Sequence, residues 1–222
     1  MSNNINRAYA NILLGTAAFS LVCITPSLDA ADSYDSPYHR FYVRGDAGVA
    51  FMQDATIKNT GGAKLSFDPG PRFDVSVGYP VSQYWHAEFQ TGFIYNTIDQ
   101  IAGIQLSSAG ASGHLMQVPV MANFIGTLPI RGPVTAYAGA GAGGVAQLYH
   151  GESSTGTDDK TAWSFGYQAL AGVNYAITAR MDVGLAYKFL GTSEHDLGFL
   201  APGLESRGNY THSVLATFTF KF

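Results

Sequence analysis

Apolar and polar residues alternate along much of the chain, and the alternation is longest over residues 210–222. One face of this segment carries Tyr210, Phe218, Phe220 and Phe222, while the other carries mostly threonine, serine and lysine. A period of two residues predicts a β-strand whose two faces meet different surroundings. The three phenylalanines suit the aromatic girdle that a membrane barrel places at the lipid interface.

Seven further segments show the same alternation, which predicts eight strands in all. The fifth is rich in glycine and alanine, so its facing is ambiguous from the sequence. Pro119 lies in the fourth and has no N–H to give to the ladder, so we expect a bulge or irregularity there. The predicted strands span residues 41–52, 72–79, 85–95, 115–125, 134–146, 163–175, 181–190 and 210–222.

The connections between these strands alternate in length. Short connections are predicted at 80–84, 126–133 and 176–180, and long ones at 53–71, 96–114, 148–162 and 191–208. The long connections follow every odd strand, so they all lie at one end of an up-and-down barrel. Outer-membrane barrels sort their loops in this way, with short turns on the periplasmic side.

The polarity of the two strand faces is the reverse of that in a soluble barrel. Residues such as Val75, Phe89 and Val214 share the predicted outward faces, whereas charged residues occupy the inward ones. A water-soluble barrel would place its charges outside. We therefore predict an all-β fold, an eight-stranded antiparallel up-and-down transmembrane β-barrel.

The first residues of the chain predict export. Arg7 lies in a short polar start, an apolar run follows over residues 12–24, and small residues stand at Ala30 and Ala31. This layout is typical of a secretory signal peptide, and the run is too short to span a bilayer as a helix. We expect a cleaved signal peptide over 1–30, a periplasmic lead-in over 31–40 and the barrel domain over 41–222.

Composition agrees with this interpretation. Charged residues make up 13% of the chain, far below the usual quarter of a soluble domain, while the chain contains 26 glycines, 13 tyrosines and 14 phenylalanines. The formal net charge is −4 and no run of Lys or Arg occurs, so nucleic acid is a poor candidate partner. Cys23 is the only cysteine and lies in the predicted signal peptide, so we expect no disulfide in the exported chain.

Several sequence strings carry a resemblance that covers the predicted barrel. They are FYVRGDAG at 41–48, QVPV at 117–120, AGAG at 138–141, GYQALAGV at 166–173 and the ending on Phe222. In this order and spacing they resemble the opacity/OmpA-like superfamily of eight-stranded outer-membrane barrels, with the barrel domain alone. The resemblance implies location in the outer membrane of a Gram-negative bacterium. It also implies that Phe218, Phe220 and Phe222 form the signal read by the outer-membrane assembly machinery.

Polar residues on the inward faces are the candidate site. Eight strands leave an interior just wide enough for side chains to fill, and buried charges must be paired. We expect one layer that contains Arg44 and Glu88 and another that contains Arg72, Asp74 and Lys188. The predicted polar network of the lumen comprises Arg44, Asp46, Arg72, Asp74, His86, Glu88, Gln117, Asp182, Lys188 and Lys221.

The function expected from this pattern is structural: a filled barrel that supports envelope integrity and displays four extracellular loops. The alternatives are a narrow gated pore, a lipid-modifying enzyme and a soluble periplasmic ligand-binding barrel. A composite catalytic site would draw on loop residues such as His150, Ser153 and His195, but polar loops carry such residues anyway. We assign no catalytic residue, no metal ligand and no cofactor.

One glycine-rich string needs separate mention. Residues 139–144 fit the spacing of a dinucleotide-binding fingerprint, but a polar segment follows where a helix should begin. Glycine in a barrel strand more simply allows bending or close packing. The partners expected are outer-membrane lipid and lipopolysaccharide, the assembly machinery during biogenesis, and a surface ligand that the sequence does not identify.

Overall fold

The structure is a computed structural model that describes residues 41–56, 64–101, 104–105, 112–153, 156–193, 195–196, 205–206 and 208–222. The predicted signal peptide and lead-in lie outside these residues. No helix among the described residues is long and apolar enough to cross a membrane.

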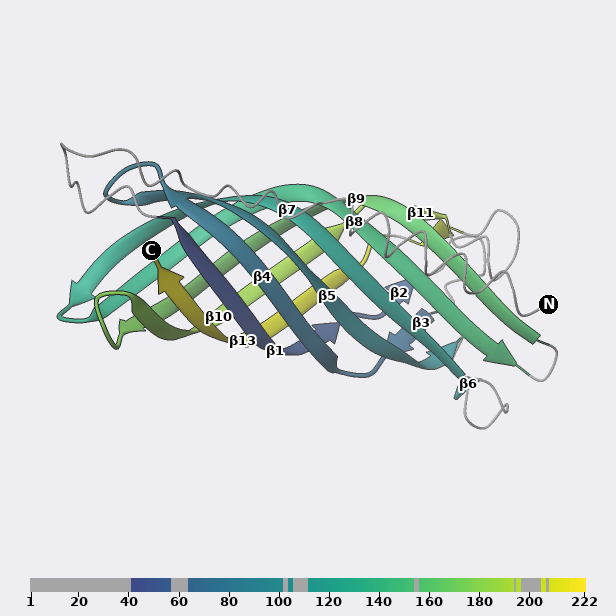
Figure 1. The fold of residues 1–222 in the computed structure, drawn as a ribbon. Helices are drawn as coiled ribbons and strands as arrows, with labels where there is room; N and C mark the ends of the chain where they lie inside the picture. Colours follow the sequence, from purple (N-terminus) through teal and green to yellow (C-terminus); the bar gives the residue numbers. More distant parts are fainter. Residues whose placement is uncertain are drawn as a thin grey trace. The chain divides into compact units, whose positions relative to one another are not determined.

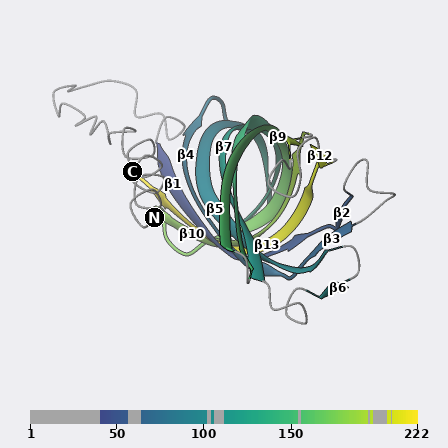
Figure 2. The ribbon, with the colours of Figure 1, turned by 90° about the vertical axis from the view of Figure 1, so that its right-hand side faces the viewer.

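Eight long antiparallel strands form a closed barrel, as the alternation predicted. The first strand pairs along one edge with the second and along the other with the last, so the sheet closes on itself (Figures 1 and 2). Closure leaves no row of unpaired backbone groups facing lipid. In barrel order the strands are β1 (Tyr42–Met52), β4 (Gly70–Pro80), β5 (Trp85–Ile101), β7 (Ser112–Arg131), β8 (Val134–Ser153), β9 (Gly156–Ala176), β10 (Met181–Thr192) and β13 (Tyr210–Lys221).

The two ends of the barrel differ. Residues 81–84, 132–133 and 177–180 connect strands at one end, which also holds the C-terminus and is called the turn end below (Figure 1). Gly132 takes a φ of 55° in the tightest of these turns, a conformation that favours glycine. The opposite, loop end holds short strands: β2 (Ala55–Thr56), β3 (Lys64–Phe67), β6 (Ile104–Gln105), β11 (His195–Asp196) and β12 (Glu205–Ser206).

Two of the predicted long loops are largely strand, which corrects the sequence analysis. β5, β7, β8 and β9 contain 17, 20, 20 and 21 residues, whereas the other four barrel strands contain 11 or 12. Strands β8 and β9 stay paired as far as Ser153 and Gly156, so the predicted loop at 148–162 is wrong. The backbone ladder continues there although the sequence no longer alternates between apolar and polar residues.

The irregularity expected at Pro119 is present, although it is not a bulge. Pro119 pairs with Val145 of β8 in an unbroken register. On the β5 side, the register before and after the proline is the same, but no paired residues occur between Thr91 and Ile94. The missing N–H of proline therefore interrupts the ladder on one side without shifting it.

The facing of the side chains follows the predicted alternation. Val75, Phe89 and Val214 point outward and are 55%, 46% and 55% exposed, whereas Arg72 and Lys188 are buried. Over residues 138–143 of the ambiguous strand β8, the alanines point outward and the glycines point inward. Gly144 lies on the outward face, beside the ring of Trp163. A Cβ atom at Gly141 would collide with the side chain of Asn123, so glycine is required where this amide crosses the lumen. Apolar side chains thus cover the outside, and polar ones fill the middle.

Candidate functional site

The ten residues predicted for the lumen all project inward. They come from β1, β4, β5, β7, β10 and β13, so they converge from most of the barrel wall. Eight are buried, while His86 and Lys221 are partly exposed near the turn end. The predicted set, with its strands, is Arg44 and Asp46 of β1, Arg72 and Asp74 of β4, His86 and Glu88 of β5, Gln117 of β7, Asp182 and Lys188 of β10, and Lys221 of β13.

Four of these residues form a central ion cluster: Asp46, Arg72, Asp74 and Lys188. The ammonium of Lys188 lies 2.7 Å from Oδ2 of Asp46 and 3.0 Å from Oδ2 of Asp74. Arg72 donates from Nε to Asp74 at 3.0 Å and from its guanidinium to Ser213 at 3.1 Å. Two cations and two anions therefore balance within a group that is almost completely buried. The predicted layer of Arg72, Asp74 and Lys188 is present, with Asp46 added to it.

Three amide side chains extend the central ion cluster across the lumen. Lys188 also donates to Oε1 of Gln90 at 3.1 Å. The same oxygen accepts from Gln168 at 3.0 Å and from Asn123 at 3.1 Å. Gln168 donates in addition to Oδ1 of Asn123 at 2.6 Å. Strands β5, β7 and β9 are thereby joined to β10 through side chains, which sequence reasoning did not foresee.

A second ionic group lies nearer the turn end. Arg44 and Glu88 approach to 3.3 Å, and the hydroxyl of Tyr42 donates to the same carboxylate oxygen at 3.1 Å. Arg44 donates from Nε to Thr219 at 3.4 Å. Its guanidinium carbon lies 4.8 Å from the ring centroid of Tyr137 and 5.5 Å from that of Tyr42. The predicted layer of Arg44 and Glu88 is thus present, and two aromatic rings enclose its guanidinium group.

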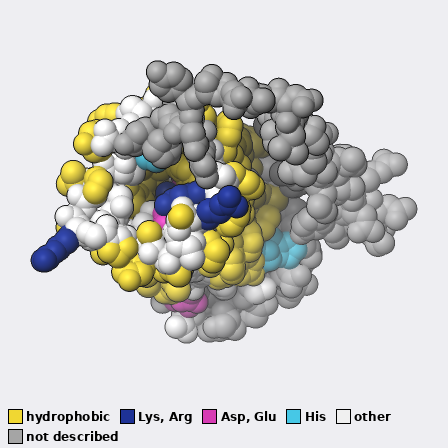
Figure 3. Space-filling view, turned by 60° about the vertical axis from the view of Figure 1, so that its left-hand side comes forward, with side chains coloured by type: hydrophobic (Ala, Val, Ile, Leu, Met, Phe, Trp, Pro, Cys, Tyr) yellow, Lys and Arg dark blue, Asp and Glu magenta, His cyan; other side chains and the backbone are white. Residues whose placement is uncertain are grey.

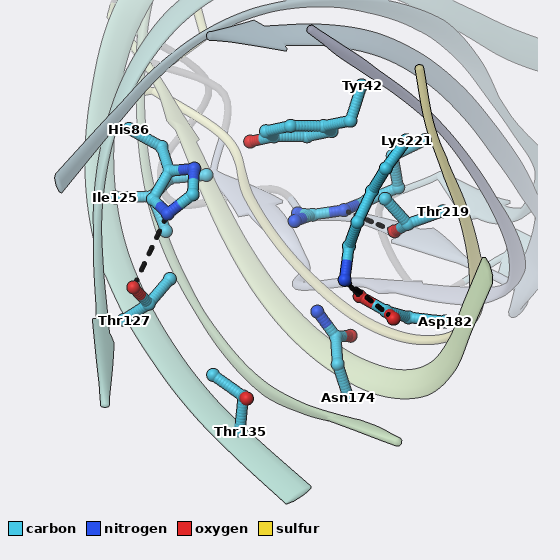
Figure 4. Close-up of a pocket in the computed structure, with 10 residues that line it drawn as sticks. Tyr42, His86, Ile125, Thr127, Thr135, Asn174, Asp182, Thr219 and Lys221 are labelled. Atoms are coloured by element: carbon cyan, nitrogen blue, oxygen red, sulfur yellow. Dashed lines mark hydrogen bonds and ion pairs between the residues drawn. The ribbon is translucent and has the colours of Figure 1, made fainter. Parts of the chain in front are cut away.

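A cavity of about 130 Å³ opens beyond Arg44 at the turn end (Figure 4). Lys221 and Asp182 form an ion pair of 2.7 Å beside it, and Lys221 is the more exposed partner. His86 faces the cavity from the opposite wall and lies 3.4 Å from the hydroxyl of Thr127. The cavity is lined by Tyr42, Arg44, His86, Ile125, Thr127, Thr135, Asn174, Asp182, Thr219 and Lys221.

An apolar layer closes the lumen on the loop side of the central ion cluster. It consists of Ala50, Ile94, Met121, Val145 and Leu190, and each of the five is 0% exposed. They come from β1, β5, β7, β8 and β10, so they meet from all sides of the wall. The layer was not predicted, because only polar inward residues were considered as candidates. Ala50, Ile94, Met121 and Leu190 lie on predicted inward positions, whereas Val145 lies in the strand whose facing was ambiguous.

Other predicted residues lie apart from these groups. Gln117 is buried on the loop side and pairs across the ladder with Ile94 and Gln147. Phe218 of β13 and Phe222, which follows this strand, are exposed, and the rings of Phe220 and Phe222 meet edge to face at 5.2 Å. Their role in assembly remains a prediction.

The loop residues weighed for catalysis contribute little to the described structure. The ring of His150 stacks on that of His114 at 4.7 Å, and the side chains of Ser153 and His195 lie outside the description. Within the described residues, no group of three or more His, Cys, Asp or Glu side chains is placed to hold a metal ion.

Comparison with known proteins agrees with the geometry. The family model described as outer membrane protein beta-barrel domain matches residues 15–222. A comparison with curated proteins gives no match.

Solved structures of outer-membrane barrels share the fold. Neisserial surface protein A is 19% identical with a TM-score of 0.58, covering 82% of this chain and 97% of that one. OprG from Pseudomonas aeruginosa is 15% identical with a TM-score of 0.56, covering 83% and 96%. A major outer membrane protein from Thermus thermophilus is 12% identical with a TM-score of 0.53, covering 83% and 99%. At these identities the likeness shows the fold alone.

Proposed function

Since the chain belongs to the outer membrane protein beta-barrel domain family and is an integral protein of the bacterial outer membrane, we propose that it acts as a closed structural barrel. In this proposal the barrel does not conduct, strengthens the envelope, and holds its loop end at the cell surface for contact with other molecules.

The observation that carries the proposal is the double closure of the lumen. The central ion cluster joins β1 and β4 to β10 across the interior, because Lys188 contacts Asp46 and Asp74 together. The apolar layer lies directly beside it and is wholly buried. An ion that crossed the barrel would have to break the buried ion pairs and then pass between five packed apolar side chains, and both steps are costly.

The long strands support the surface part of the proposal. A tilted strand of about nine to eleven residues is enough to cross the hydrocarbon core. Strands β5, β7, β8 and β9 exceed this by roughly six to twelve residues, which corresponds to about 15–30 Å beyond the membrane at ordinary rise and tilt. Four adjacent strands thereby present a stiff sheet at the loop end, which is a suitable platform for binding.

Conductance in planar lipid bilayers tests the closed lumen. We expect the refolded chain to give no current steps under conditions in which an open general porin gives them. Steps that change in size with Leu190→Ala or Lys188→Met would overturn the proposal, because both residues lie in the closing groups. Steps unaffected by either variant would point to membrane defects rather than to a path through the lumen.

A narrow pore is the second candidate, and the turn-end cavity is the observation in its favour. About 130 Å³ of the lumen is open on that side, so part of a path through the barrel is already present. If the barrel does conduct, Lys221→Gln at the mouth should change the preference for cations over anions. A current without ion preference in either form would count against this path.

A further inference from the structure

The turn-end cavity has the features of a binding site and is not used by the closed barrel proposed above. Figure 3 shows basic side chains and an acidic one gathered at the centre of this end, within a ring of hydrophobic side chains. In this family the turn end faces the periplasm. The cavity is therefore open to solutes of the periplasm and is closed on its inner side by Arg44 and Glu88.

Hydrogen-bond donors converge on the cavity from three walls. Arg44 is 4% exposed, and its Nη1 atom, although 3.3 Å from Glu88, makes no hydrogen bond among the described residues. Such an unused buried donor is rare and is satisfied by a ligand or water. The ammonium of Lys221 donates one hydrogen bond to Asp182, and its other N–H groups can donate to a ligand. Asn174 accepts from Thr217 through its side-chain oxygen, which leaves its amide group for the cavity.

The hydrogen-bond donors of the walls, rather than their net charge, suit a guest with one carboxylate. Arg44 is balanced by Glu88, and Lys221 is balanced by Asp182, so the site is neutral before a guest arrives. One carboxylate can use the free donors of the two cations, and planar guanidinium groups bind carboxylates well. A second negative charge would have no cationic partner in this partly buried site of low dielectric constant, which disfavours phosphate as a dianion.

Size and apolar contacts narrow the ligand further. A volume of about 130 Å³ corresponds to roughly four water molecules at ordinary liquid density. The walls also include Ile125 and the rings of Tyr42 and His86. Ile125 and His86 lie opposite Lys221 and Asp182 (Figure 4). These groups can cover a short alkyl chain while the donors hold the charged end.

We propose that this cavity binds a short-chain carboxylate from the periplasm, either as a free acid or as the terminal carboxylate of a longer chain. In this arrangement Arg44 and Lys221 bind the carboxylate oxygens, Asn174 donates a further hydrogen bond, and Ile125 contacts the alkyl part. The site lies on the turn side of the central ion cluster. It therefore does not depend on whether the lumen conducts.

Solution NMR of the refolded chain in micelles tests the proposal. Propionate is titrated at constant ionic strength while the side-chain signals of His86 and Asn174 are followed. We expect shifts that saturate, and we expect neither propionamide nor sodium chloride to produce them. Shifts that rise linearly without saturation, or that propionamide reproduces equally, would overturn the proposal.

A pair of charge-matched variants locates the site. Lys221→Gln should weaken propionate binding about tenfold, as expected for the loss of one charge-assisted hydrogen bond. Arg131→Gln removes the same charge from an exposed position at the turn end that does not line the cavity, and should change affinity less than about twofold. Equal weakening by both variants would show general attraction to charge and would overturn the assigned site.

Two peptides distinguish the sources of the carboxylate. A short peptide that ends in a free carboxylate and its C-terminally amidated form are titrated in the same way. Saturable shifts with the free form alone would assign the site to chain ends that enter from the periplasm. Saturable shifts with propionate but with neither peptide would assign it to free acids. Inorganic phosphate that binds more tightly than propionate would refute the preference for a single charge.

Discussion

The central ion cluster and the apolar layer close neighbouring slices of the same lumen by opposite chemistry. In the cluster, every charge is held by a named partner on another strand, as in the contacts of Lys188 with Asp46 and Asp74. In the layer, side chains such as Leu190 and Met121 fill the cross-section through shape alone. The stability of the ion cluster therefore depends on every one of its charged residues. The stability of the apolar layer depends on the total volume of its side chains.

The ion cluster also fixes the register between strands that are not neighbours, which the apolar layer does not. Strands β10 and β4 are not neighbours in the sheet, since β13 and β1 lie between them. The contact of Lys188 with Asp74 therefore bridges the interior and ties the register of one strand to the other. Apolar side chains can pack after small shifts of the strands, whereas separating an ion pair leaves a buried charge without a partner. The cluster thus favours one arrangement, while the layer excludes water.

Removing one cation from the cluster should have the largest effect. Lys188→Met leaves Asp46 and Asp74 with only Arg72 to balance them, so we expect the free energy of unfolding to fall by about 3–5 kcal/mol. Urea unfolding in lipid vesicles, followed by tryptophan fluorescence, measures this change. The double variant Lys188→Met with Asp46→Asn restores neutrality and should recover more than half of the loss. A double variant no more stable than the single one would contradict the role of charge balance.

Shortening a side chain in the apolar layer should have the next largest effect. Leu190→Ala removes buried methyl groups from a fully enclosed position, and we expect a loss of about 3 kcal/mol from transfer and cavity terms. Leu190→Met keeps the volume and should cost less than about 1.5 kcal/mol. The same unfolding measurement compares the two. If both variants lost the same amount of stability, side-chain volume would not be what stabilises the apolar layer.

A smaller effect is expected where a hydroxyl supports an ion pair. Tyr42→Phe removes the hydrogen bond to Glu88 but keeps the ring beside Arg44. Since Arg44 still balances the carboxylate, we expect a loss of about 1.5 kcal/mol, typical of a hydrogen bond to a charged group. Tyr42→Leu, which removes the ring as well, should be less stable than Tyr42→Phe. Equal stability of the two variants would show that the ring contributes nothing.

The period of two residues was enough to predict the facing of almost every long strand. It placed Arg72 and Lys188 inside and Val75 and Val214 outside, because lipid and lumen demand opposite side chains at successive positions. It could not decide β8, where glycine and alanine are both small and apolar. There the structure supplies the reason, since Asn123 leaves no room for a Cβ atom at Gly141.

Two features were beyond the reach of the pattern. The outer parts of β8 and β9 lie where neither face must be apolar, so the alternation ends at the membrane although the pairing continues to Ser153 and Gly156. The two carboxylates that pair with Lys188, Asp46 and Asp74, lie more than a hundred residues away in sequence. These residues meet only when the barrel closes, and the register between its first and last strands cannot be read from a single sequence.

The mouth of the lumen should respond least to the loss of a charge. Lys221 pairs with Asp182 at 2.7 Å, but its side chain is 39% exposed, so water screens the pair. We expect Lys221→Gln to lower the free energy of unfolding by no more than about 0.5 kcal/mol, in contrast to Lys188→Met in the centre. A loss as large as that of Lys188→Met would show that the mouth is as dry as the central ion cluster, and the cavity could then hardly admit a solute. A small loss keeps the binding experiment with Lys221→Gln free of unfolding effects, because the fold is retained while a donor is removed from the cavity.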